Sequence, residues 1–201
     1  MKSLSRITAV NRIIEMTSGE VISNLTDLAT IPVAVKASNQ LDYSTDKILT
    51  ELEWFYNTLN SLTLTANVDG EIILPNNLTQ IEFEQSTPVP VPYLSVVGGK
   101  VYDKRTQTTV LGTSASVTFS GQLTFDFEDL PFAFQMLAIA DARLYIATGA
   151  SHISPTRTET ERKSYADALQ TTQKFDDKLG GSRMRPLGSQ RRRHSNNHGF
   201  I

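Results

Sequence analysis

The chain has no cysteine among its 201 residues. This absence excludes disulfide bonds, thiol nucleophiles and thiolate metal sites. Histidine, the commonest metal ligand and a frequent general base, occurs only three times, and two of the three, His194 and His198, lie in a polar C-terminal stretch. The third, His152, stands between the last two predicted helices, and we do not expect it to be catalytic. We therefore expect no metal site and no cofactor.

Long apolar runs are also missing. The most apolar region, 130–146, is interrupted by Gln135, Asp141 and Arg143, whereas a membrane helix needs roughly 18 or more apolar residues in a row. The N-terminus carries positive charges but neither the apolar core nor the cleavage site of a signal peptide. We therefore expect no membrane partner and a protein that is made in a cytoplasm.

Motifs for enzyme chemistry are absent as well. Gly98-Gly99-Lys100 lacks the earlier glycine and the following Ser or Thr of a phosphate-binding loop, so we interpret it as a tight turn. The densest carboxylates, Asp126, Glu128 and Asp129, precede a predicted helix, and helix capping explains them without a metal. We expect no enzyme activity. The rival interpretation is a metal-dependent hydrolase, for which the sequence lacks the usual spacing of histidine and aspartate ligands.

The charges that are present are unevenly distributed. Hydrophobic residues make up 39% of the chain and charged residues 20%, with a net charge of −2, which is typical of a folded soluble protein. Five of the 19 basic residues and none of the 21 acidic residues lie in 183–201, so the preceding residues carry a net charge of −7. An acidic main part with a basic tail indicates electrostatic docking onto an acidic partner.

Apolar spacing predicts four helices. The first covers about 5–17, the third runs from 128 to Thr148 before Gly149, and the fourth opens at Ser154-Pro155 and ends at Gly180-Gly181. The second helix either is continuous from about residue 33 or begins at a cap formed by Ser44 and Thr45. Its apolar face comprises Leu41, Ile48, Leu52, Phe55, Leu59 and Leu62.

Between the second and third helices the apolar period changes to two. Short β-type runs at 71–74, 79–84, 93–97 and 116–127 are separated by turn signals. We expect the last run to fold as a hairpin over Ser120-Gly121. The proline-rich segment 88–92 is a rigid extended edge or connector, since proline cannot donate to a sheet.

The sequence therefore predicts an α+β fold. Residues 1–62 and 128–181 form a four-helix bundle-like body, residues 63–127 an inserted antiparallel β lobe, and residues 182–201 a flexible basic tail that orders on meeting a partner.

Two further groups of side chains have structural interpretations. Trp54-Phe55-Tyr56 is expected to pack in the core, with Phe55 on the core face, and an inter-subunit contact is the second interpretation. Asp176 and Asp177 are expected on the solvated face of the fourth helix.

The basic tail is the main candidate binding segment. We favour its docking on an acidic protein surface. Nucleic-acid binding is an alternative, because an arginine triplet neutralises phosphates, although aromatic residues for base stacking are not interleaved with it. A merely solvated tail is the third interpretation. The candidate residues are Arg183, Arg185, Arg191, Arg192 and Arg193.

Several segments, taken in order, resemble the family of tail tubular protein A, the head-to-tail adaptor of short-tailed phages. The family's opening helix and loop are similar to AVNRIIEMTSGEVISNL (9–25), and its strand entering the β lobe to VDGEIILP (68–75). A hairpin is similar to KVYDKRTQT (100–108), and the third helix to FEDLPFAFQMLAIADARLY (127–145). The resemblance spans 7–182 and is carried by the ordered set of segments.

This resemblance implies a structural virion protein, assembled in the host cytoplasm and located in the tail at the head-to-tail interface. Twelve copies would form a ring between the portal protein and the nozzle, which is made of tail tubular protein B. DNA would pass through the ring, and the tail fibres would be anchored beside it. The resemblance does not extend to the tail, whose five arginines we expect to bind the portal. The alternative is a nucleic-acid-binding accessory protein that acts through the same arginines.

Overall fold

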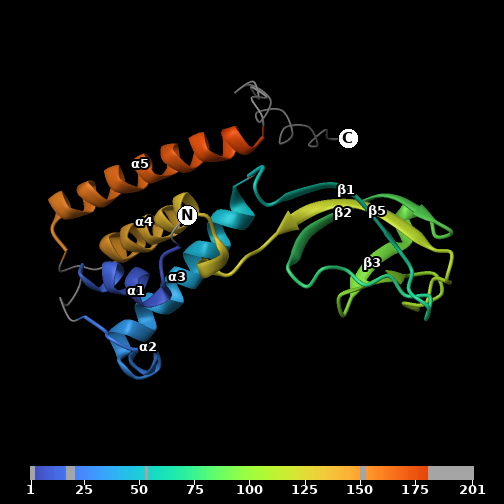
Figure 1. Cartoon of the computed structure of the whole chain (residues 1–201), viewed down its shortest axis with the longest axis horizontal. Coiled ribbons are helices and arrows are strands. Elements are labelled where there is room, and N and C mark those ends of the chain that lie inside the picture. Colours follow the sequence, from blue (N-terminus) through green and yellow to red (C-terminus); the bar gives the residue numbers. More distant parts are fainter. Residues whose placement is uncertain (1–2, 17–20, 53, 150–152, 181–201) are drawn as a thin grey trace, which may run out of the picture.

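A computed structural model describes residues 3–16, 21–52, 54–149 and 153–180 of the chain. A helical body and a β lobe lie at opposite ends of an elongated molecule (Figure 1). The predicted α+β class is confirmed, with five α-helices in the described residues where the sequence predicts four. His152 and the basic tail lie outside the described residues.

The helical body is formed by two separate parts of the sequence, one before the β lobe and one after it. Ser5 caps the first helix by accepting a hydrogen bond from the backbone N–H of Thr8. A short helix that was not predicted from the sequence begins with a capping box between Asn24 and Asp27. The helices are α1 (Arg6–Ile14), α2 (Leu25–Thr30), α3 (Pro32–Glu51), α4 (Phe132–Gly149) and α5 (Pro155–Leu179).

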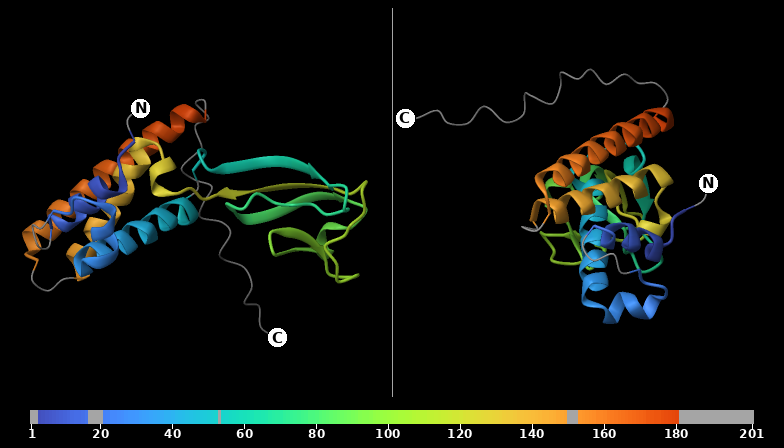
Figure 2. Two further views of the ribbon diagram at one scale, coloured as in Figure 1. Left: turned by 60° about the horizontal axis from the view of Figure 1, so that its bottom comes forward. Right: turned by 90° about the vertical axis from the view of Figure 1, so that its left-hand side faces the viewer.

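Helix α4 lies at the centre of the body. It packs against α1, α3 and α5, and Figure 2 shows α5 alongside it. Its central residues from Phe134 to Ala142 are buried, apart from the half-buried Met136, because the segment is apolar on nearly every side. No helix in the described part of the chain is long and apolar enough to cross a membrane. The body core includes Val10, Ile13, Leu41, Ile48, Trp54, Phe134 and Leu137.

The predicted second helix is correct in its first part and wrong in its last part. Helix α3 ends at Glu51, and strand β1 (Thr58–Thr65) begins seven residues later. Leu59 and Leu62 continue the helical spacing by coincidence, whereas Leu62 and Leu64 also fit a period of two. Thr63 and Thr65 alternate with these two leucines and favour the strand, since β-branched residues pack well on a sheet.

The lobe contains a three-stranded antiparallel sheet in the order β1-β5-β2 and a separate β3–β4 hairpin. The β3–β4 turn at Gly98 and Gly99 is confirmed, because both glycines have positive φ angles. The remaining strands are β2 (Leu78–Thr87), β3 (Leu94–Val97), β4 (Lys100–Asp103) and β5 (Ser116–Leu123). Segment 88–92 leaves the sheet after β2 as a connector with a short 3₁₀ helix at Val91–Tyr93.

The predicted hairpin over Ser120-Gly121 is wrong. Both residues lie inside the continuous strand β5, which pairs with β1 on one side and β2 on the other. Gly121 allows close packing rather than a turn, since a Cβ there would lie 2.9 Å from a methyl group of Leu78 and 3.1 Å from the carbonyl oxygen of Thr79. The predicted strand at 71–74 forms only isolated bridges.

The lobe has its own hydrophobic core, separate from that of the body. It lies between the three-stranded sheet and a second layer made by the β3–β4 hairpin and the 71–74 segment. Its buried members are Ile72, Leu74, Val89, Leu94, Val101, Ala115, Val117 and Phe119.

Candidate assembly surfaces

The arginines predicted as the binding site, Arg183, Arg185, Arg191, Arg192 and Arg193, all lie outside the described residues. The structure therefore leaves their role as a prediction. The surfaces that the described residues offer for contact belong to the helical body, the lobe and the junction between the two.

The carboxylates before α4 lie at and within a short 3₁₀ helix. Asp126, Glu128 and Asp129 are exposed, and Asp126 makes no capping hydrogen bond at the start of the 3₁₀ helix Phe127–Asp129. Within the described ranges, no three metal-ligating side chains are grouped so that they could hold an ion. Burial and the nearby charges of Asp42 and Asp126 raise the pKa of Asp46 on α3, so these acids contribute to one negative surface region.

Buried charges in the body are used to join helices. The carboxylate of Asp141 on α4 accepts hydrogen bonds from Ser44 Oγ and Lys47 Nζ on α3, both at 2.8 Å. The hydrogen bond to Asp141 raises the pKa of Lys47. On the other side of α4, Arg143 donates two hydrogen bonds of 2.8 and 2.9 Å to Glu161 of α5. These charged groups are already satisfied, so their arrangement supports helix packing rather than catalysis.

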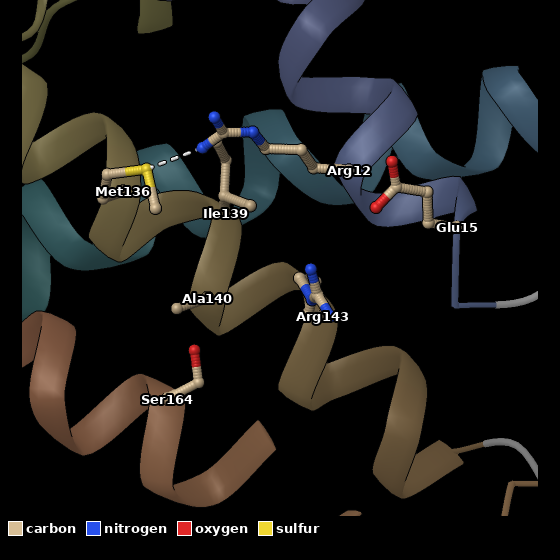
Figure 3. Close-up of a pocket in the computed structure, with 7 residues that line it drawn as sticks. All are labelled: Arg12, Glu15, Met136, Ile139, Ala140, Arg143 and Ser164. Carbon is tan, nitrogen blue, oxygen red and sulfur yellow. Dashed lines mark hydrogen bonds between the residues drawn. The ribbon is translucent and has the colours of Figure 1, made fainter. Parts of the chain in front are cut away.

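A shallow hollow of about 220 Å³ lies between α1, α4 and α5 (Figure 3). The guanidinium of Arg12 contacts the sulfur of Met136, with Nη1 at 3.0 Å from Sδ. Arg143 is engaged by Glu161, and Glu15 adds a negative charge at the rim. The mixed charges and the apolar floor formed by Ile139 and Ala140 provide no nucleophile with a neighbouring base, and the hollow is suited to a protein contact.

The body exposes an aromatic pair between α3 and α4. The rings of Tyr43 and Tyr145 lie 6.2 Å apart, and each residue is more than half exposed. Paired tyrosines at a surface are common in protein interfaces, since they bury much apolar area at a low cost in conformational entropy.

The lobe exposes apolar residues on the outer face of its second layer. Ile73, Val97 and Val110 are each about half exposed, and Ile73 and Val97 both pair with Lys100 in the ladder. Lys100 forms an ion pair with Glu71 at 2.6 Å on the same face. An apolar surface around a satisfied ion pair is suited to a protein partner.

The junction between body and lobe contains a residue whose position the sequence analysis misjudged. Asp176 is not solvated but buried, and it accepts hydrogen bonds from the backbone N–H groups of Phe55 and Tyr56, both at 2.8 Å. Its neighbour Asp177 is exposed, as predicted. The spacing from Thr172, which is buried four residues earlier, was the signal that could have placed Asp176 inward.

The family comparison is consistent with a chain built for contacts. The model of the tail tubular protein family matches residues 7–178, which agrees with the extent of the resemblance seen in the sequence. No curated protein matches the chain. Because the match covers most of the sequence, the chain belongs to the tail tubular protein family, whose members are structural components of the phage tail.

Proposed function

We propose that the chain is the subunit of an adaptor ring that joins the portal to the tail nozzle. Twelve copies would form the ring, line the channel through which DNA leaves, and help to anchor the tail fibres. The family match over residues 7–178 is the observation that carries this proposal.

The two-part shape of the molecule supports the proposal. The body and the lobe have separate hydrophobic cores, and each exposes its own apolar side chains. Tyr43 and Tyr145 lie on the body, whereas Ile73, Val97 and Val110 lie on the lobe. A subunit of this kind can contact neighbouring copies through its body while its lobe is free to meet the nozzle or the fibres.

Unpaired negative charge near the junction supports a role in DNA passage. Five exposed carboxylates near the junction, two on α3 and three in the segment that returns from the lobe, form no ion pair with any described residue. A negative channel wall repels phosphates and lets DNA slide without adhering. These residues are Asp46, Glu51, Asp126, Glu128 and Asp129.

The basic tail is proposed to bind the portal. Twelve tails held side by side would present a high local concentration of arginine, so weak individual contacts would sum to a stable joint. The proposal requires an acidic surface on the portal ring, and the contact would weaken as the salt concentration rises.

Mixing the purified chain with portal rings tests the proposal. Electron microscopy should show one added ring with twelve-fold symmetry, and portal rings that remain unchanged would overturn the adaptor assignment. Deletion of 183–201 should weaken binding to the portal by at least tenfold. As a matched control, replacing the five arginines with lysine should retain most of the binding, whereas glutamine should reproduce the deletion.

The same variants distinguish the nucleic-acid alternative, which the arginine content of the tail favours. A nucleic-acid-binding accessory protein would shift DNA in a gel at low salt, with an affinity that falls steeply as salt is added. Binding of DNA by the free chain, together with portal binding that the deletion leaves unchanged, would favour this alternative for the tail.

A further inference from the structure

The end of helix α5 is joined to the root of the lobe by a buried carboxylate. Asp176 is 8% exposed, and its two oxygens each accept one backbone hydrogen bond, Oδ2 from Phe55 and Oδ1 from Tyr56. No ion pair with a cation is formed by Asp176 among the described residues. The two peptide N–H groups are therefore what satisfies this charge in its buried position.

The two residues held by Asp176 lie at the point where the chain leaves the body for the lobe. Phe55 and Tyr56 follow the end of α3 at Glu51 and precede the start of β1 at Thr58. This segment is outside any helix or strand, so its N–H groups have no partners from regular secondary structure. The carboxylate supplies those partners from a helix that is 120 residues away in the sequence.

Ring contacts place α5 and the connecting segments in one cluster. Phe134 of α4 lies between Tyr56 and Phe175 of α5, with ring centroids 5.0 and 6.2 Å away. Tyr56 also contacts Phe125 in the segment that returns from the lobe, at 5.3 Å. The backbone of Gly180 packs closely on the ring of Phe55, since a Cβ there would lie 3.3 Å from it. The outgoing connection thus meets the end of α5 directly, and the returning connection joins the same cluster through Tyr56.

We propose that Asp176 is a clamp that fixes the orientation of the β lobe relative to the helical body. The two cores are separate, so the lobe is held mainly by its two connecting segments and by a few contacts with α3, such as the hydrogen bond from Gln80 to the carbonyl of Thr50. Burial of apolar surface is non-directional, whereas two hydrogen bonds to one carboxylate fix the positions of two successive peptide groups. If the chain forms the proposed ring, the clamp also makes every copy present its lobe at the same angle. This second consequence rests on the proposed function.

The clamp can be tested on the isolated full-length chain. Because the chain has no cysteine, spin labels attach only at introduced cysteines, here Asn39→Cys on α3 and Val68→Cys on the lobe. Both positions are exposed. In this background Asp176→Ala removes both acceptors, and Asp177→Ala is the matched control because it deletes an exposed carboxylate one residue away.

Double electron–electron resonance measures the distance between the two spin labels. It should give one narrow distance distribution for the parent and for Asp177→Ala, and a wider one for Asp176→Ala. Amide hydrogen exchange at Phe55 and Tyr56 should accelerate about tenfold or more in Asp176→Ala, and less than about twofold in Asp177→Ala, because only the former exposes these N–H groups. These readouts do not involve the portal, so the clamp and the adaptor assignment can fail separately.

Asp176→Asn covers the case in which the alanine variant does not fold. It keeps the volume and one acceptor, and it should accelerate exchange at one of the two amides while retaining the other. An unchanged distance distribution and unchanged exchange at both amides, in whichever of the two variants folds, would overturn the proposal.

Discussion

Trp54 and Phe55 are adjacent in the sequence and occupy opposite environments. Trp54 is 4% exposed, donates its Nε1–H to the carbonyl of Ile48 at 2.6 Å, and meets Phe134 edge-on at 5.1 Å. Phe55 is 45% exposed. The sequence interpretation placed Phe55 on the core face because it extended α3 through this segment. Once the helix ends at Glu51, helical spacing no longer determines which side chain points inward.

Trp54→Ala should therefore destabilise the chain much more than Phe55→Ala. Removing a fully buried tryptophan leaves a cavity and costs about 3–5 kcal/mol of unfolding free energy, whereas a half-exposed ring contributes about 1 kcal/mol. Urea unfolding followed by far-UV circular dichroism measures both variants, since the signal does not depend on the tryptophan. Equal losses for the two variants would contradict the assignment of Trp54 to the core.

At the scale of elements, α5 differs from the other helices in how it is attached. Its buried residues are Glu161, Thr172 and Asp176, all polar, and each hydrogen-bonds to a neighbouring element. Apolar contact is limited to partly buried residues such as Leu169 and Phe175. Directional contacts of this kind set the register of the helix on α4 as well as contributing to its stability.

Glu161→Ala and Glu159→Ala make a matched pair that tests this attachment. Glu161 is 3% exposed, and its removal leaves Arg143 unpaired in a partly solvated position. We therefore expect Glu161→Ala to lower the free energy of unfolding by about 1–3 kcal/mol. Glu159 lies two residues away and pairs with Arg162 at 3.4 Å, with both side chains more than half exposed, so its removal should cost about 0–1 kcal/mol. Chemical denaturation measures the free energy of unfolding of both variants. A Glu161→Ala variant as stable as Glu159→Ala would show that the buried pair contributes nothing.

Elements with local signals were predictable from the sequence, and elements set by tertiary contacts were not. Ser154-Pro155 and Gly180 mark the two ends of α5, and Gly98-Gly99 marks the β3–β4 turn, because capping and positive φ depend on a few adjacent residues. The end of α3 and the continuity of β5 through Gly121 depend on the partners across the sheet. The inward position of Asp176 depends on the path of a segment 120 residues away.

At the scale of the whole molecule, the division into two cores is the feature that matters most. The α+β class follows from the change of apolar period along the chain, but the orientation of the lobe depends on contacts such as Asp176 with Tyr56 that no local pattern encodes. The candidate site in the tail was predictable only from composition, as a run of arginine without acids. Its partner is a property of another molecule and cannot be derived from this chain.

The carboxyl pKa shifts in the lobe and in the body have opposite directions. In the lobe, a hydrogen bond from Arg105 lowers the pKa of Asp103 from 3.8 to about 2, and hydrogen bonds from Lys100 and Thr109 lower the pKa of Glu71. Groups with lowered pKa values stabilise the folded state above their ordinary pKa, and this stability is lost as the pH falls through the folded value. In the body, the pKa of Asp46 is raised, so protonation there relieves a cost of folding.

The lobe should therefore unfold before the body as the pH falls from about 4 to 2. Trp54, the only tryptophan, lies in the body core, so its fluorescence follows the body alone, while far-UV circular dichroism follows both parts. The dichroism should change first, at a pH where the emission of Trp54 is still native. Arg105→Gln should move the first transition to higher pH, because the pKa of Asp103 returns toward 3.8 when its donor is lost. Coincident transitions in the parent chain, unmoved by Arg105→Gln, would mean that the two cores unfold as one unit.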